Sequence, residues 1–202
     1  MAEKRSEAPS GLSVGLLGGS FNPAHEGHLH LTHMALEALA LDRIWWLVSP
    51  QNPLKSTRDM APLDERLAGA RALVEKSGDP RILVTAIETE LGTRYTIDTV
   101  RALKARYADT RFVWLMGADN MIELPRWANW RELTQEIPIA VYPRPGFTMK
   151  ARTCPAAALL RSVTLEASEA DRLAKSAPPA LVFLDGPEHL ASSTEIRARH
   201  GR

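Results

Sequence analysis

The chain has 202 residues, with 25 Lys and Arg against 24 Asp and Glu, and a formal net charge of +1 at pH 7. This length suits one domain with a sizeable core, and the balanced charge gives no broad basic field for binding nucleic acid or an acidic membrane. The one cysteine, Cys154, excludes an intrachain disulfide framework and suits the cytoplasm. No run approaches the roughly 20 apolar residues that a membrane-spanning helix needs.

Strand-like and helix-like segments alternate along the chain after a polar start. We expect residues 1–10 to form a disordered tail before a single domain over residues 11–202. The strand-like apolar runs are 13–17, 44–49, 82–87, 112–116, 137–142 and 181–184. Helical spacing of apolar residues covers 29–39, 63–74 and 97–108, whereas 143–155 and 176–179 are predicted to be loops. The alternation predicts an α/β fold, a parallel sheet with helices on both faces.

The most informative segment is residues 18–28, Gly-Gly-Ser-Phe-Asn-Pro-Ala-His-Glu-Gly-His, between the first predicted strand and the first predicted helix. Glycines let the backbone come close to a bulky anion, and a helix N-terminus offers N–H groups and a partial positive charge. His25 and His28 add donors that can be charged or neutral near physiological pH. The segment predicts a phosphate site that needs no covalent nucleophile.

Two other interpretations of this segment fit less well. Gly15, Gly18 and Gly19 give G-x-x-G-G instead of the dinucleotide fingerprint G-x-G-x-x-G. The crowded histidines lack the His-Glu-x-x-His spacing of zinc proteases, so we expect no protein-bound metal there. The remaining histidines of the cluster, His30 and His33, are expected to be surface or packing residues.

Polar residues follow three of the predicted strands, at 20–28, 49–55 and 117–120. Ligands of parallel α/β sheets bind beyond the carboxyl ends of the strands. We therefore expect these three segments to converge on one site.

Residues 18–28 resemble the signature of the nucleotidylyltransferase superfamily, whose core motif is His-x-Gly-His. Residues 192–197, Ser-Ser-Thr-Glu-Ile-Arg, resemble the second signature of that superfamily, a serine- and threonine-rich turn near the C-terminus. Within the superfamily, the chain is most similar to the bacterial nicotinate-nucleotide adenylyltransferases along almost its whole length. Further similar segments are 48–55, 94–99, 117–120, 124–127 and 144–146.

This resemblance implies a Rossmann-like fold of the nucleotidylyltransferase type. It also implies adenylyl transfer from ATP to nicotinate mononucleotide, with Mg²⁺ bound mainly through the ATP phosphates. The products are nicotinate adenine dinucleotide and pyrophosphate. The attacking phosphate oxygen is already anionic, so positioning and charge stabilisation can carry most of the catalysis without a general base. No recognisable Ser-His-Asp or Cys-His pattern competes with this interpretation.

The resemblance assigns roles to individual residues on the ATP side. His25 and His28 are expected to bind the α-phosphate and, with Arg197, to be the catalytic residues. Arg197 suits a forked contact with phosphate oxygens, and the serine-rich turn is expected to open a last helix over 195–200. The predicted ATP- and phosphate-binding residues are Gly18, Gly19, Ser20, Phe21, Lys55, Ser192, Ser193 and Thr194.

A second group is expected to bind the nicotinate nucleotide. Trp127 resembles the residue that stacks on the pyridine ring, and such stacking is worth about 0.5–1.5 kcal/mol beyond burial. Tyr95 and Thr96 are expected to donate to the pyridine carboxylate, which disfavours an amide. Asp119 is implied to hydrogen-bond a ribose or a nearby group. For Arg144, contact with a nucleotide phosphate and exposure to solvent both stay open.

Three alternatives remain at this point. A nicotinamide-nucleotide adenylyltransferase uses nearly the same substrate. Phosphopantetheine adenylyltransferases share the histidine motif and the serine turn but lack a segment like that of Trp127. A non-catalytic nucleotide sensor on the same fold would have no need to keep His25, His28 and Arg197 together. The sequence leaves the oligomeric state open.

Overall fold

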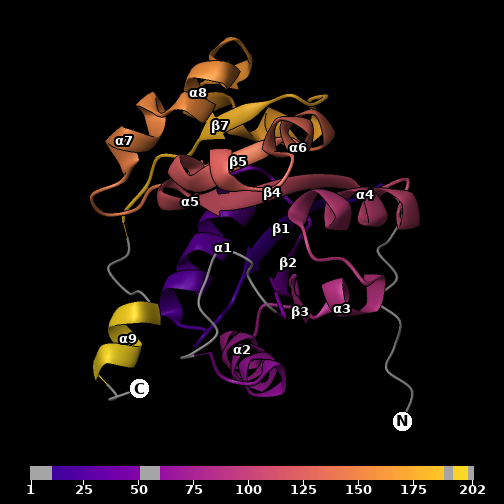
Figure 1. Cartoon of the computed structure of the whole chain (residues 1–202), viewed down its shortest axis with the longest axis vertical. Coiled ribbons are helices and arrows are strands. Elements are labelled where there is room, and N and C mark those ends of the chain that lie inside the picture. The colour runs from indigo at the N-terminus through magenta and orange to yellow at the C-terminus, as the bar shows by residue number, and fades with distance from the viewer. Residues whose placement is uncertain (1–10, 51–59, 189–192, 200–202) are drawn as a thin grey trace.

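A computed structural model describes residues 11–50, 60–188 and 193–199 of the chain. Within these ranges, seven strands form one sheet in the order β3-β2-β1-β4-β5-β7-β6, and all neighbouring strands are parallel (Figure 1). The strands are β1 (Ser13–Gly19), β2 (Arg43–Val48), β3 (Ile82–Thr85), β4 (Arg111–Gly117), β5 (Ile139–Tyr142), β6 (Thr164–Leu165) and β7 (Leu181–Phe183). The expected α/β fold with a parallel sheet is therefore confirmed.

Helices connect these strands. The α-helices are α1 (Glu26–Ala38), α2 (Leu63–Ser77), α3 (Ile87–Leu91), α4 (Thr96–Arg106), α5 (Ala118–Glu123), α6 (Trp130–Glu136), α7 (Thr148–Thr153), α8 (Pro155–Leu160) and α9 (Ser193–Arg199). Three 3₁₀ helices complete the set: η1 (Leu124–Arg126), η2 (Arg161–Val163) and η3 (Ala167–Lys175). None of the helices in the described part of the chain is long and apolar enough to cross a membrane.

The six predicted strands are present, with ends within two residues of the prediction, and the predicted loop at 176–179 is also confirmed. The predicted loop at 143–155 is wrong, because it contains α7 and the first residue of α8. Gly146 turns the chain at φ +77° just before α7, and Pro155 occupies the first turn of α8, where a missing N–H costs nothing. The two residues that suggested a loop thus mark helix starts. The predicted tail at 1–10 lies outside the described residues.

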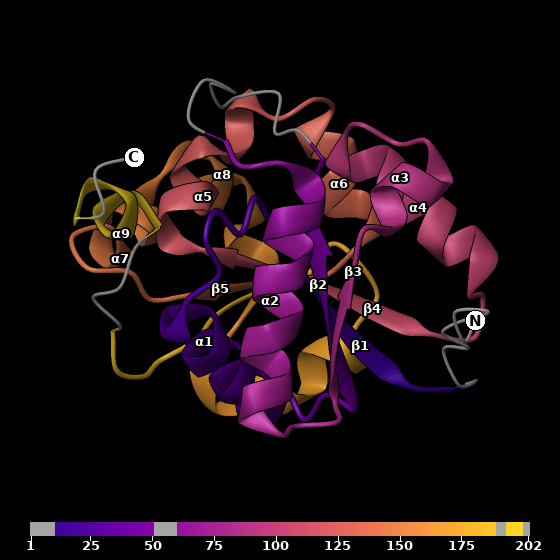
Figure 2. The ribbon, with the colours of Figure 1, turned by 90° about the horizontal axis from the view of Figure 1, so that it is seen from below.

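Side chains that alternate along the strands build two cores, one on each face of the sheet. Trp45 belongs to the core under α4, α5, α6, α7 and α8, whereas its neighbour Trp46 belongs to the core under α1, α2 and η3. Both tryptophans are almost completely buried. Figure 2 shows α2 lying across β2 and β3 with α1 beside it. The sheet is therefore covered on both faces, as a parallel sheet requires.

The strand order reverses at β1. The chain runs from β1 to β2 and β3 on one side, then crosses to β4 and β5 on the other side. Ligands of open α/β sheets bind in the crevice at such a switch point, beyond the carboxyl ends of the two diverging strands. The segments after Gly19 and Gly117 border this crevice.

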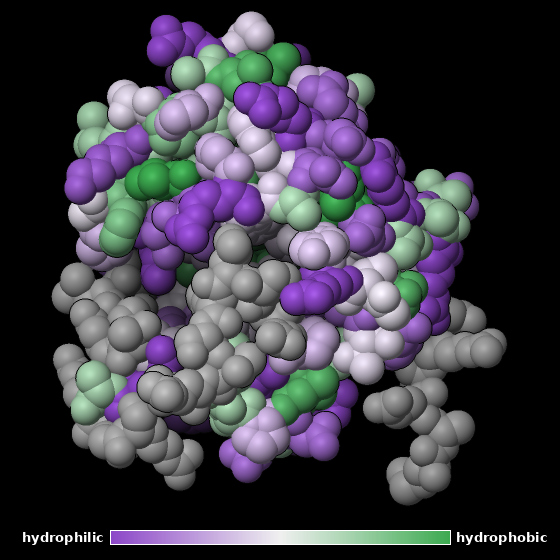
Figure 3. Space-filling view, viewed as in Figure 1, coloured by the Kyte–Doolittle hydropathy of each residue, from purple (hydrophilic) through white to green (hydrophobic). Residues whose placement is uncertain are grey.

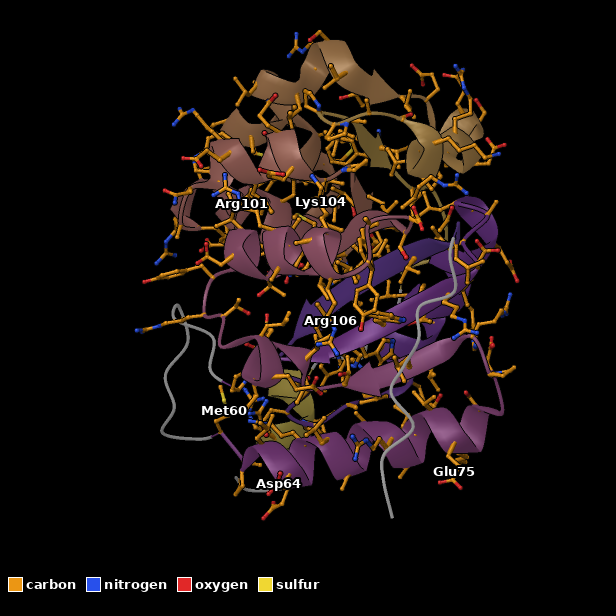
Figure 4. The ribbon with its side chains drawn as sticks, turned by 90° about the vertical axis from the view of Figure 1, so that its right-hand side faces the viewer. Met60, Asp64, Glu75, Arg101, Lys104 and Arg106 are labelled. Carbon is orange, nitrogen blue, oxygen red and sulfur yellow. The ribbon has the colours of Figure 1, made fainter. Side chains whose placement is uncertain are left out.

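Ion pairs tie α4, whose first residue is the predicted nicotinate-binding Thr96, to α6. Arg101 contacts Glu132 at 2.8 Å and Glu136 at 3.0 Å, and Lys104 contacts Glu136 at 2.8 Å. Figure 4 shows Arg101 and Lys104 on the same side of α4. Among the coloured residues of Figure 3, hydrophilic ones predominate and hydrophobic ones stand apart from one another.

Gly18 lies where β1 packs closely under a ring from β4. A Cβ atom on Gly18 would lie 2.8 Å from Cη2 of the Trp114 ring. We therefore expect Gly18→Ala to destabilise the protein by about 1–3 kcal/mol through overpacking. Gly69, inside α2, has open space around its Cβ position, so Gly69→Ala is expected to stabilise by about 0.5–1 kcal/mol.

Urea unfolding of the two variants beside the wild type measures both changes. The two substitutions add the same methyl group. Changes of opposite sign in the free energy of unfolding would therefore isolate the effect of the Trp114 contact. A Gly18→Ala variant as stable as Gly69→Ala would contradict the close packing of β1 and β4.

Candidate active site

The two histidines of residues 18–28 lie at the start of α1. His25 is the residue before the helix, with extended backbone, and His28 is its third residue. The backbone N–H of His25 donates to Nδ1 of His28 at 3.2 Å. An Nδ1 atom that accepts is unprotonated, so the neutral ring of His28 carries its proton on Nε2. The helix start thus sets the tautomer of His28 and makes Nε2 a donor.

Aromatic rings hold His28 in place. The rings of Phe21, His28 and Trp46 contact one another, with the Phe21 centroid 4.8 Å from His28 and 5.0 Å from Trp46 and the His28 and Trp46 centroids 5.8 Å apart. The His25 ring lies 3.9 Å from that of His28. Trp46 Nε1 donates to Thr32 Oγ1, which donates to the carbonyl of His28, each at 2.8 Å. Phe21 is only 2% exposed, so we infer that its ring holds the His28 ring in place.

One pocket of about 420 Å³ opens beside these rings. Its lining combines the end of β1, the start of α1, the start of α5 and α9. The lining residues are Leu17, Gly18, Gly19, Ser20, Phe21, Asn22, His25, His28, Leu31, Met60, Asp119, Asn120, Tyr142, Arg144, Ser193 and Arg197. The structure therefore brings together residues from both ends of the chain, as the two signature motifs predicted.

Helix α9 contacts the loop between β1 and α1 through two side chains. Ser193 Oγ donates to the carbonyl of Pro23 at 3.0 Å, and Arg197 Nη1 donates to the carbonyl of Asn22 at 2.5 Å. These bonds place the Arg197 guanidinium in the wall of the pocket. Of the other predicted phosphate-binding residues, Lys55 and Ser192 and the side chain of Thr194 lie outside the described residues.

The opposite wall of the pocket comes from the ends of β4 and β5. Asp119 Oδ1 lies 3.5 Å from Nε of Arg144, and both residues line the pocket. Arg144, whose role the sequence left open, is therefore the ion-pair partner of Asp119. A Cβ on Gly117 would collide with the Asp119 carboxylate, so glycine lets this side chain fold back over the turn. Burial, and secondarily the Asp119 charge, raises the pKa of the Tyr142 hydroxyl, which stays protonated and can donate.

The predicted nicotinate-binding residues Tyr95, Thr96 and Trp127 are not among the residues that line this pocket. Tyr95 is the residue before α4 and is 41% exposed, and Thr96 is the first residue of that helix. The Trp127 ring meets the Trp114 ring edge to face at 6.2 Å, and Trp114 in turn packs on Gly18. Trp127 is thus linked to the pocket floor through Trp114.

Glu88 is a buried acid that the sequence interpretation missed. Its side chain is 8% exposed and hydrogen-bonds Ser49, after β2, and Thr99 in α4. Thr99 Oγ1 also lies 2.8 Å from Thr93 Oγ1 and donates to the carbonyl of Tyr95 at 3.3 Å. Glu88 therefore connects the loop after β2 with the start of α4, where the predicted nicotinate-binding residues Tyr95 and Thr96 lie. In the sequence, Glu88 is one charged residue between the apolar Ile87 and Leu91, and this pattern does not indicate a buried acid.

The histidines outside the pocket have other partners. His30 Nε2 lies 3.0 Å from the carbonyl of Pro187, and His33 Nε2 lies 3.4 Å from the Asp79 carboxylate. Among the described residues, no group of three or more His, Cys, Asp or Glu could hold a metal ion. His30 and His33 are partly exposed and contact Pro187 and Asp79 outside the pocket, as predicted for surface or packing residues.

Comparison with known proteins agrees with this geometry. The family model described as cytidylyltransferase-like matches residues 16–199. The chain belongs to the cytidylyltransferase-like family. A relative within it, from Parvibaculum lavamentivorans, is named "Probable nicotinate-nucleotide adenylyltransferase" and is 62% identical over 201 residues, covering 100% of this chain and 98% of its own length. A relative of the same name from Cereibacter sphaeroides is 52% identical over 185 residues, covering 92% of this chain and 96% of its own.

Solved structures show the same fold at much lower identity. The Plasmodium falciparum nicotinic acid mononucleotide adenylyltransferase complexed with NaAD superposes with a TM-score of 0.72 at 16% identity, covering 93% of this chain and 83% of that one. The complex of that enzyme with APC gives a TM-score of 0.68 at 15% identity, with the same coverage. At these identities the likeness establishes the nucleotidyltransferase type of Rossmann-like fold alone.

Burial raises the pKa of Glu88 above its ordinary 4.5, so the folded state holds this proton more tightly than the unfolded state. Stability from this group is complete below the ordinary pKa and is lost as the pH rises through the folded pKa. We expect Glu88→Gln to remove that loss. The stability of the variant relative to the wild type should therefore increase as the pH rises above about 4.5 and then level off.

Urea unfolding at a series of pH values measures this difference. The matched control is Glu90→Gln, because Glu90 is an exposed residue of the same helix. If the curve for Glu88→Gln follows that of Glu90→Gln, burial of Glu88 does not govern its protonation.

Proposed function

We propose that this protein transfers the adenylyl group of ATP to nicotinate mononucleotide, giving nicotinate adenine dinucleotide and pyrophosphate in NAD biosynthesis. The observation that carries this proposal is the one pocket that His25, His28 and Arg197 share at the switch point of the sheet. Curated relatives named "Probable nicotinate-nucleotide adenylyltransferase", up to 62% identical along the chain, support the choice of substrates.

The reaction needs charge stabilisation and alignment more than proton transfer. A phosphate oxygen of nicotinate mononucleotide forms a bond to the α-phosphorus of ATP. The bond from that phosphorus to the oxygen bridging to the β-phosphate breaks, and pyrophosphate leaves with the electron pair. The attacking oxygen is already anionic, so no base has to remove a proton.

Residues 18–28 supply donors for the α-phosphate in this proposal. His28 presents its Nε2–H because Nδ1 is already an acceptor. Ser20 Oγ is buried and has no hydrogen-bond partner among the described residues, so a phosphate oxygen would satisfy it. His25 and the backbone of Gly18 and Gly19 border the same space. Donors that are fixed before the substrate arrives stabilise charge without reorganisation.

Arg197 and Ser193 are placed for the leaving group. The bond from Arg197 to the Asn22 carbonyl orients its guanidinium in the pocket wall, and a guanidinium fork matches two phosphate oxygens. Lys55, Ser192 and Thr194 remain predicted ligands of the β- and γ-phosphates. Tyr95, Thr96, Asp119 and Trp127 remain the predicted ligands of the nicotinate nucleotide.

The pocket suits Mg²⁺ held mainly by the ATP phosphates. Among the described residues that line it, Asp119 is the one acid, and it would hold the water ligands of the ion. Mg²⁺ keeps much of its water and often needs few protein ligands, so this donor set fits. Bound Mg²⁺ neutralises charge on the phosphate oxygens.

Cys154 is a free, buried thiol, which agrees with the predicted cytoplasmic location.

The substrate is tested by pyrophosphate release with ATP and Mg²⁺, using nicotinate mononucleotide, nicotinamide mononucleotide and phosphopantetheine in parallel. We expect strong preference for the nicotinate form and loss of release when Mg²⁺ is chelated. Equal use of the two pyridine nucleotides would keep the reaction and refute donation to the carboxylate near Thr96. Release with phosphopantetheine alone would refute the nicotinate site.

The role of His28 is tested by His28→Asn. Asparagine can still accept the His25 N–H bond but has no donor at the Nε2 position, so the helix start is kept. We expect kcat to fall about 10²–10³-fold, as for loss of one donor to a transition-state oxyanion, with little change in ATP affinity. The control is His30→Ala, because His30 is on the same helix but contacts Pro187 outside the pocket. Full turnover by His28→Asn would remove His28 from the catalytic residues.

A further inference from the structure

Arg66 is a charged residue in the interior of the protein. It belongs to the first turns of α2, and its side chain is only 4% exposed. A buried guanidinium is costly unless its donors are all used. Its partners are therefore informative about what the surrounding structure needs.

The hydrogen-bond partners of Arg66 in the described ranges are backbone carbonyls. Nη1 donates to Ser20 at 2.7 Å and to Ser49 at 2.8 Å, Nη2 donates to Pro50 at 3.1 Å, and Nε donates to Ala61 at 2.9 Å. These carbonyls come from three separate segments: the loop after β1, the loop after β2 and the approach to α2. One planar group thus fixes the spacing of three loops.

Two of these segments form the wall of the pocket. Ser20 lines it, and so does Met60, the residue before Ala61 (Figure 4 labels Met60 near the start of α2). The N–H of Ala61 also donates to Oδ1 of Asn22, another lining residue, at 3.3 Å. Arg66 therefore stands directly behind the wall that carries the proposed donors for the α-phosphate, and it does not line the pocket itself.

Within the described part of the chain, the charge of Arg66 has no acidic counterpart. Among the described residues, no carboxylate forms an ion pair with it, and burial lowers the pKa of its guanidinium. The described groups that meet the positive charge are carbonyl dipoles. An anionic ligand in the pocket would therefore lie in front of a fixed positive charge, which favours phosphate groups there.

We propose that Arg66 is a positioning residue for adenylyl transfer, which holds the carbonyls of Ser20, Ser49 and Ala61 so that the phosphate-binding wall keeps its shape. This inference rests on the proposed function and deepens it. Lysine keeps the charge but is a point donor without the planar fork. The shape requirement and the charge requirement can therefore be separated by substitution.

The experiment compares Arg66→Lys and Arg66→Met with the wild type, with Arg71→Met as the matched control, because Arg71 is an exposed residue of the same helix. Three quantities are measured: kcat and KM for each substrate, the Kd of ATP by calorimetry, and the midpoint of urea unfolding. We expect Arg66→Lys to lower kcat about 100-fold, as an ångström-scale misplacement of reacting groups does. The KM of nicotinate mononucleotide should change little. Arg66→Lys should also weaken ATP binding, and Arg66→Met should weaken it more than Arg66→Lys does.

A purely structural role makes a different prediction. If Arg66→Lys unfolds more easily but has the kcat and the ATP Kd of the wild type when folded, the positioning role is overturned. If the wild type binds ATP but forms no dinucleotide, the proposed function fails. In that case, weaker ATP binding by Arg66→Lys than by Arg71→Met still supports the positioning role, and equal binding overturns it.

Discussion

The pairing of β1 with β4 is the constraint on which the rest of the structure depends. Because these neighbours run in parallel and the chain leaves them in opposite directions, both carboxyl ends open at one crevice. The Trp114 ring closes the floor by packing on Gly18, which leaves room for no side chain there. The loops that supply the pocket start from this fixed edge, so their positions follow from the sheet.

Two of the side chains that line the pocket, His28 and Arg197, have polar atoms that already bond to the protein. His28 uses Nδ1 for the helix start and its ring faces for Phe21 and His25. Arg197 uses one N–H for the Asn22 carbonyl. Each group therefore has little freedom to reorient before a ligand arrives. Such preorganisation is the main source of electrostatic stabilisation in enzymes that need no covalent intermediate.

Sequence patterns were sufficient for six of the seven strands and for the two signature motifs, because strand periodicity and the His-x-Gly-His spacing are local properties. Strand β6, with two residues, is too short to show a periodicity. Arg66 escaped notice because its partners are carbonyls, which every residue has, although its spacing from Leu63 and Ala70 places it on the buried face of α2. The ion pair between Arg144 and Asp119 could not be predicted from the sequence either, because the ends of β4 and β5 become neighbours only when the sheet forms. The positions of Trp127 and Tyr95 relative to the pocket depend on helix packing that no local pattern encodes.

The docking of α9 has a consequence for the order in which the protein is made. Ser193 and Arg197 reach back to Pro23 and Asn22, which leave the ribosome far earlier. A nascent chain can thus form the strands and the histidine turn while the arginine of the same pocket has not yet been synthesised. Assembly of the complete pocket therefore waits until α9 has been synthesised, so a product truncated before α9 would keep the strands but lose Ser193 and Arg197 from the site.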